Sequence, residues 1–355
     1  MSQVAEFNRG PNGFGFDIEH VWAEPLPYEQ IAAESTLGSA AYEVKLHHAL
    51  VGNDPEERTI TLSPHSTNSE LYAAVLGGWL PASWASFRHR LILDRNAVSW
   101  FRENYDDGYP RTDRLPDLFD MVARGPFVRI NHLLYAMEGN AQSWPTPEVI
   151  AQQLTEASSY LRKALPNARL EPSDDIGMQA IEGILREWAS AFAIEDRFLR
   201  GAAPLIRDRP GKESARVAKL KQLLKLATDT GAEQAKFMVI AAVAALLGER
   251  PKGGNAAFRI LKPGSASFDT ADVWNACCDL RALRLLVSLS NFRPKEPMAF
   301  VTRDKRLVHF WAALGIDRVE PKGGQLFMPM NPHPGVFGLE GDARALWDEW
   351  NEGSH

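Results

Sequence analysis

Apolar side chains recur every three or four residues through the middle of the chain. This spacing predicts four amphipathic or buried helices, over residues 148–165, 177–199, 212–226 and 233–247. Proline and glycine residues fall between these segments, where helices are expected to end. The stretch from about 140 to 265 therefore reads as a predominantly helical region.

Short apolar runs of a different kind lie on both sides of this helical region. Leu91-Ile-Leu is followed by Asp94, and 298–301 is followed by Thr302-x-Asp304. Runs of this length are typical of buried parallel strands, and open α/β sheets collect their ligands at the carboxyl ends of such strands. We therefore predict an α/β fold with a parallel sheet between helices, and an amphipathic helix over 305–314.

The same patterns divide the chain into three parts. Residues 1–88 are rich in glycine, proline and small residues with weak periodicity, which predicts an accessory N-terminal extension. Residues 89–330 form the predicted main domain, with a helical insertion at about 140–265. Residues 331–355 form a C-terminal tail of mixed character.

Composition narrows the class of protein. A formal charge of −6 over 355 residues does not indicate nucleic-acid binding, although a local basic patch would suffice for it. The two cysteines, Cys277 and Cys278, are adjacent, so a disulfide between them or a cysteine-rich zinc site is not expected. No secretion signal is visible, and the longest apolar run, 237–247, is too short for a membrane span. We expect a cytoplasmic protein without membrane contact.

One predicted helix, beginning near residue 270, carries polar residues on an otherwise apolar surface. Asp272, Asn275 and Asp279 recur at i, i+3 and i+7, which places them on one helical stripe. A carboxylate in an apolar interior is tolerated when it is paired or bound to a metal. Asp272 is expected to be an early-helix acid that interacts with the helix dipole, which leaves Asp279 as the candidate ligand.

Acids in four separate segments can together form a metal site. Asp94 and Asp304 follow strands, Glu138 lies at a helix or its end, and Asp279 lies on the striped helix. Mg²⁺ and Mn²⁺ prefer carboxylate oxygen, and a pair of such ions supports phosphodiester hydrolysis. The supporting residues that we expect around these acids are Asn96, Asn275 and Thr302.

Four short motifs resemble those of the PIN-like nucleases. They are Leu93-Asp94-x-Asn96, Tyr135-Ala-Met-Glu138-Gly, Asn275-x-x-x-Asp279-Leu-Arg and Val301-Thr302-x-Asp304-Lys, and the resemblance covers about residues 89–320. It implies a parallel sheet between helices and a cluster of acids that binds divalent metal to cut RNA. The chain departs from the compact pattern in its helical insertion and its N-terminal extension.

Each acid also has an ordinary structural interpretation. Asp94 can be a helix cap, Asp304 a turn residue, and Asp279 the partner of Arg281 or Arg284. Glu138 can be structural, with a different glutamate in its place. The rival glutamates are Glu148, Glu156 and Glu195.

A basic helical face bears on the substrate. Lys212, Arg216 and Lys219 share one face of the predicted helix over 212–226, opposite an apolar face. Such a face can follow the phosphates of RNA or single-stranded nucleic acid, but it is more often simply solvated.

These observations predict a metal-dependent endoribonuclease, a hydrolase of phosphodiester bonds that uses Mg²⁺ or Mn²⁺. A role as a bacterial toxin or defence effector, held in check by an inhibitor or partner protein, is one setting for such an enzyme. The alternatives are a non-catalytic PIN-like protein that binds nucleic acid or a partner, and a haloacid-dehalogenase-like phosphohydrolase. The last uses an aspartate such as Asp94 as nucleophile and wants a second acid two residues later, where this chain has Asn96.

Overall fold

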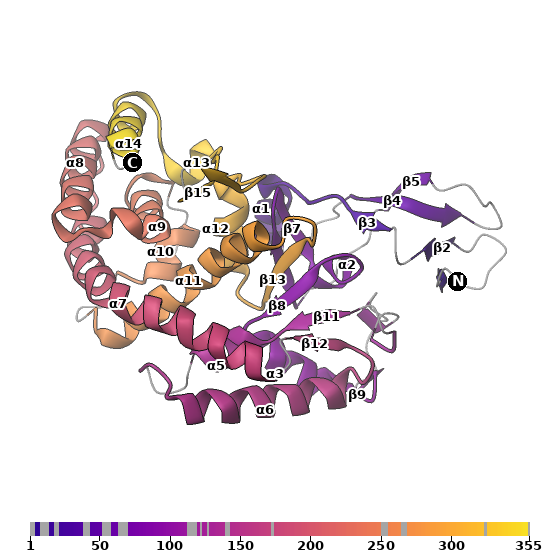
Figure 1. Ribbon diagram of the computed structural model, residues 1–355. Coiled ribbons are helices and arrows are strands. Elements are labelled where there is room, and N and C mark those ends of the chain that lie inside the picture. Colours follow the sequence, from indigo (N-terminus) through magenta and orange to yellow (C-terminus); the bar gives the residue numbers. More distant parts are fainter. Residues whose placement is uncertain are drawn as a thin grey trace.

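The chain forms an α/β fold around a six-stranded sheet (Figure 1). The computed structural model describes residues 4–7, 14–17, 21–37, 43–51, 58–62, 70–111, 119–120, 123–125, 128–138, 143–171, 174–249, 255–263, 268–322 and 325–353. The strand order in the sheet is β12-β11-β8-β13-β6-β7. The strands are β6 (Tyr72–Val75), β7 (Gly78–Pro81), β8 (Arg90–Leu93), β11 (Arg129–Asn131), β12 (Arg169–Glu171) and β13 (Met298–Thr302).

Four neighbouring strands of this sheet, β12, β11, β8 and β13, run parallel. Every residue of β8 and of β13 is buried, as their continuous apolar runs require. The predicted α/β class with a parallel central sheet is confirmed. The chain moves outward from β8 to β11 and β12 on one side, and β13 is added on the other side of β8. The strand order therefore reverses between β8 and β13, the position where open α/β sheets bind ligands.

The sheet also includes part of the predicted N-terminal extension. Strands β6 and β7 form a hairpin, and β6 pairs antiparallel with β13. Leu26 pairs with Trp79 of β7 on the outer edge of the hairpin. A Cβ on Gly78 would lie 2.1 Å from the Leu26 carbonyl oxygen, so only glycine allows the two backbones to come this close. The predicted domain boundary at residue 88 therefore runs through the sheet.

The rest of the N-terminal segment extends away from the main body (Figure 1). It forms a second, five-stranded sheet, in which β4 is central and pairs with β2, β3 and β5. Its strands are β1 (Val4–Phe7), β2 (Phe14–Asp17), β3 (Trp22–Ala23), β4 (Val44–Val51) and β5 (Arg58–Leu62). Helix α1 (Tyr28–Leu37) follows β3 and contacts α12 (Lys305–Leu314).

The four helices predicted from periodicity are all present. They are α6 (Pro147–Ala164), α7 (Asp174–Arg207), α8 (Glu213–Thr230) and α9 (Lys236–Leu247). Helix α7 includes Pro204 in its last turn and ends at Arg207. Residues 237–247 of α9 are all buried, and α7, α8, α10 (Ala256–Leu261) and α11 (Thr270–Phe292) pack around this helix.

The predicted insertion at 140–265 is not purely helical. The three-residue strand β12 lies between α6 and α7 and extends the parallel sheet.

No helix in the described ranges has the length and apolar content that a bilayer crossing requires. The remaining elements are α2 (Ala82–Ala85), α3 (Arg95–Asn104), β9 (Tyr105–Asp106), β10 (Tyr109–Pro110), α5 (Leu133–Glu138), η1 (Ala232–Gln234), β14 (Glu320–Lys322), β15 (Gln325–Phe327), α13 (Pro334–Phe337) and α14 (Gly341–Gly353).

Candidate acidic site

Asp94 and Thr302 lie side by side at the carboxyl ends of the two central strands. Leu93 is in register with Val301, and the Asp94 backbone N–H donates to the Val301 carbonyl at 3.3 Å. Each strand then turns directly into a helix, α3 after β8 and α12 after β13. The polar residues that follow the two strands therefore meet at the point where the strand order reverses.

The Thr302 hydroxyl connects two of the acids. Its side chain is fully buried, bonds to the Asp94 carboxylate, and accepts the backbone N–H of Asp304 at 2.9 Å. Its hydrogen bond to Asp94 lowers the pKa of that carboxyl, against the effect of burial. The Thr302 hydroxyl therefore interacts with the Asp94 carboxylate and with the backbone of Asp304.

Glu138 and Asp279 face the same group from other elements. Asp279 lies on α11, which packs against β13, and Glu138 is the last residue of α5, which follows β11. Asp304 and Asp94 act electrostatically on Asp279, while Asp94 and Asp279 act on Glu138. The Glu138 carboxylate also accepts the Arg95 backbone N–H at 3.4 Å. The structure thus brings the four predicted acids into one electrostatic group.

Three acids of this group, Asp94, Glu138 and Asp279, hold their protons more tightly than free carboxyls do. Burial raises the pKa of Asp94 to about 6 and that of Asp279 to about 7, and it raises the pKa of Glu138 well above its ordinary value. Repulsion between the carboxylates adds to burial in all three cases. Four acids held together at this cost are characteristic of a functional site rather than of a stabilising core.

Two cations border the acids. Lys262 and Arg306 each lower the pKa of Asp279, and Arg306 binds the Asp304 carboxylate through two nitrogens at 2.8 and 2.9 Å. Lys262 is exposed and has a left-handed backbone, with φ of 48°. Sequence reasoning missed both residues. Arg306 lies two positions after Asp304 and could have been noticed, but nothing in the sequence marks Lys262.

The ordinary interpretations of Asp94 and Asp304 are also correct as local roles. Asp94 caps α3 by accepting the Ala97 N–H at 2.7 Å, and Asp304 caps α12 by accepting the Arg306 N–H at 2.9 Å. Helix capping accounts for one carboxylate oxygen of each residue. It does not explain why these two capping aspartates lie beside Glu138 and Asp279. Asp272 lies in the first turn of α11, as expected for an early-helix acid.

The alternative partners of Asp279 and the rivals of Glu138 are engaged elsewhere. Arg281 binds Glu195 in a fully buried pair, and Arg284 binds Glu187. Glu148 lies in the exposed first turn of α6, and Glu156 accepts the Tyr160 hydroxyl at 2.7 Å. Of the four glutamates considered, Glu138 is the one on which Asp94 and Asp279 act directly.

Three predicted supporting or binding residues, Asn96, Asn275 and Lys219, do not bond through their side chains to the acids. Asn96 is exposed, and its backbone rather than its side chain bonds to Asp94. The Asn275 side chain is also exposed and makes no hydrogen bond within the described part of the chain. Lys219 donates to the Leu205 and Asp208 carbonyls at the end of α7, so its ammonium is used to cap that helix.

The rest of the predicted basic face is divided. Lys212 is exposed at the start of α8, whereas Arg216 is half-buried in a pocket away from the acids. The apolar face of the same helix is buried, as expected. Lys219 thus contacts the end of α7 and Arg216 lines a pocket, and phosphate binding by these three residues stays a prediction.

The donor set fits a divalent ion that retains water. Among the described residues, no three acidic, histidine or cysteine side chains surround one point at ligand distance. Mg²⁺ usually binds through one or two carboxylates with water and substrate phosphate completing its shell, so three direct ligands are not required. Cys277 and Cys278 are free thiols whose pKa burial raises strongly, so they remain protonated and cannot serve as thiolate nucleophiles.

Comparison with known proteins gives no relative: no family model, curated protein or solved structure matches the chain significantly.

Proposed function

We propose that this protein is a metal-dependent endoribonuclease that hydrolyses phosphodiester bonds with Mg²⁺ or Mn²⁺. One observation carries the proposal: Asp94, Glu138, Asp279 and Asp304 gather at the carboxyl edge of β8 and β13, where the strand order reverses. The motif order and this α/β topology also support a PIN-like identity for the domain.

The acids supply oxygen ligands whose mutual repulsion an ion would relieve. Asp94, Asp279 and Asp304 form the centre of the proposed site, with Glu138 beside them. A bound Mg²⁺ or Mn²⁺ would supply water activation and charge stabilisation at a phosphodiester. Thr302 interacts with the Asp94 carboxylate and fixes the Asp304 backbone, and Lys262 and Arg306 favour the approach of a phosphate.

A direct assay tests the activity. The purified chain should cut labelled single-stranded RNA internally when Mg²⁺ or Mn²⁺ is present, and EDTA should stop the cleavage. Single-stranded DNA of the same sequence, tested in parallel, distinguishes RNA from a general single-stranded substrate. A non-catalytic binding protein would retain the RNA without shortening it at any metal concentration.

Thr302→Val should lower kcat about 10- to 100-fold, the usual cost of removing an outer partner of a metal ligand. The hydroxyl bonds to Asp94 and lowers the pKa of that acid, so its loss should also move the rising limb of the pH–rate profile to higher pH. Pre-steady-state cleavage measured between pH 5 and 9 detects both effects. Thr302→Ser keeps the hydroxyl and should retain most of the activity; an unchanged profile for the valine variant would contradict the role.

Lys262→Asn should raise KM about 2- to 5-fold with a smaller change in kcat, because an exposed charge contributes modestly to phosphate binding. Asparagine tolerates the left-handed backbone at this position, so the fold should be preserved. Steady-state kinetics at low and high salt measures the change. Lys295→Asn, at an exposed lysine in the turn after α11, is the matched control and should leave KM unchanged.

A further inference from the structure

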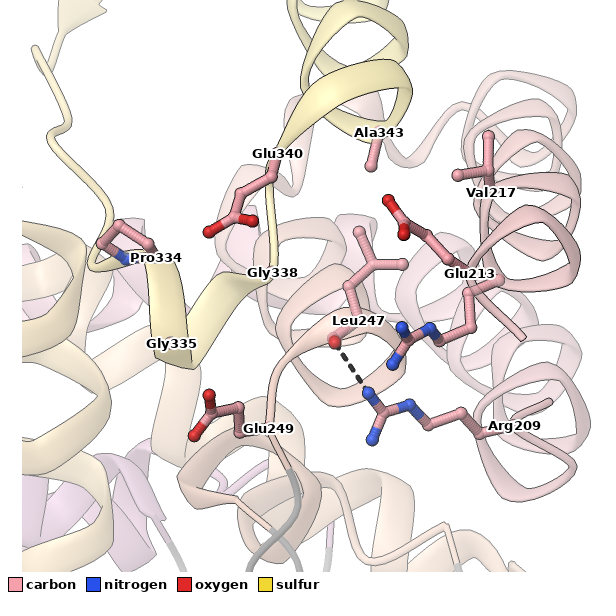
Figure 2. A pocket seen from close by; sticks show the side chains of 11 residues that line it. Arg209, Glu213, Val217, Leu247, Glu249, Pro334, Gly335, Gly338, Glu340 and Ala343 are labelled. Atoms are coloured by element: carbon pink, nitrogen blue, oxygen red, sulfur yellow. Dashed lines mark hydrogen bonds between the residues drawn. The ribbon is translucent and has the colours of Figure 1, made fainter. Parts of the chain in front are cut away.

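A charged pocket lies apart from the acids, where three segments of the chain meet (Figure 2). The connection between α7 and α8, the end of α9, and the segment around α13 and the start of α14 enclose about 210 Å³. None of its lining residues is among the electrostatic neighbours of Asp94, Glu138 or Asp279. The pocket is therefore independent of the proposed nuclease site.

The walls of the pocket are joined by backbone contacts. Arg209 donates to the Leu247 carbonyl at 2.8 Å, and the Glu249 N–H donates to the Gly335 carbonyl at 2.9 Å. A Cβ on Gly248 would lie 1.8 Å from the Val336 carbonyl oxygen, so the two backbones are in direct contact and only glycine fits. The pocket is a fixed feature of the fold.

Five charged side chains line this pocket without ion-pair partners. They are Arg209, Glu213, Arg216, Glu249 and Glu340. In the part of the chain that the structure describes, none of the five forms an ion pair within 4.0 Å. Figure 2 shows Glu249 and Glu340 across the pocket from Arg209. Charges that are not paired with one another remain available to a ligand of complementary charge.

The two arginines in particular lack compensation. Arg209 has a buried Nε that finds no hydrogen-bond partner among the residues the structure describes, and its pKa is lowered by burial and by the nearby charge of Arg216. A guanidinium pair of this kind is suited to a carboxylate or another planar anion. The three glutamates, whose side chains are exposed, offer negative charge to a cationic group. The side chains sum to one negative charge, because two arginines face three glutamates.

We propose that this pocket binds a free basic amino acid, with its carboxylate against the arginines and its two cationic groups against the glutamates. Such a ligand carries a net charge of one positive, which is equal and opposite to the net charge of the pocket side chains. The volume of about 210 Å³ is below the roughly 300–1,000 Å³ of sites for drug-sized ligands, which fits a molecule this small. Leu247 and Pro334 provide apolar surface for its aliphatic stem.

Calorimetric titration of the full chain with L-arginine and L-lysine tests the proposal. Arg216→Gln and Glu340→Gln should each weaken binding about tenfold or more, because each removes a charge-assisted hydrogen bond. Neither side chain makes a bond that joins the pocket walls, so both variants should fold, and circular dichroism checks this. Lys221→Gln, at an exposed lysine on α8, is the matched control and should bind like the wild type.

Two further probes identify what is recognised. Agmatine lacks the carboxylate and inorganic phosphate lacks the cationic groups, so both should bind far more weakly than L-arginine. Equal binding of agmatine would overturn the carboxylate contact, and binding of phosphate without L-arginine would show a simple anion site instead. Absence of heat with all four probes would overturn the proposal, whatever the outcome of the RNA assay.

Discussion

Replacing Asp304 or Asp94 by asparagine should lower RNA cleavage at least about 100-fold while leaving the protein folded. Loss of an outer partner of a metal site already costs about 10- to 100-fold, and these variants remove a carboxylate from the centre of the proposed site. Asparagine keeps a side-chain oxygen that can accept the Ala97 N–H in one variant and the Arg306 N–H in the other. Single-turnover cleavage of labelled RNA, with circular dichroism of each variant, gives the comparison.

Asp269→Asn is the matched control for both variants. Asp269 caps α11 by accepting two backbone N–H groups, so this change also replaces one capping carboxylate, but outside the group of four acids. It should leave cleavage unchanged. Full activity in a folded Asp304→Asn variant would remove that residue from the site, and equal losses in all three variants would indicate damage to helix caps instead.

The local pattern was sufficient to predict the two strand ends of the site. Asp94 and Thr302-x-Asp304 each follow a short apolar run, and the rule that such runs form parallel strands places them at one edge of a sheet. Periodicity also predicted α6 to α9, because each buries an apolar stripe. These features depend on residues that are neighbours in the sequence.

What the sequence did not predict depends on contacts between distant segments. β12 has three residues, too few to show a period, and it exists because β11 offers a parallel edge. β6 and β7 join the sheet through β13, more than 200 residues later in the chain. Lys262 lies near Asp279 because α10 packs against α11. Lys219 donates to two carbonyls at the end of α7, a contact that depends on how α7 and α8 pack.

The same limit applies to the individual roles of charged residues. A carboxylate at a helix start is a good cap in any protein, so the sequence cannot separate a cap from a ligand at Asp94. The decisive feature is the proximity of three other acids, which raises pKa values. Repulsion of this kind has a consequence for stability that a cap alone does not have.

Asp279→Asn should stabilise the metal-free protein at pH 8 by about 1–2 kcal/mol, allowing for partial screening by solvent, and should abolish cleavage. The pKa of Asp279 is about 7 in the folded chain against an ordinary value of 3.8, so between these values the folded state binds more protons than the unfolded state. Stability therefore falls as pH rises through this range, and the full penalty is present above about pH 7. The asparagine variant has no carboxyl at this position, so its stability should not fall in this way as pH rises.

Denaturant unfolding in EDTA at pH 4 and pH 8 measures the effect. The two proteins should differ little at pH 4, close to the ordinary pKa of 3.8, where most of the penalty has not yet developed, and the variant should be more stable at pH 8. Mn²⁺ in place of EDTA at pH 8 should stabilise the wild type, because an ion that binds the ionised carboxylates favours the folded state, and should stabilise the variant much less. A wild type that gains stability from pH 4 to 8 relative to the variant would mean that Asp279 has a compensating partner. A gain of stability that accompanies loss of activity is expected where acids are held together for function.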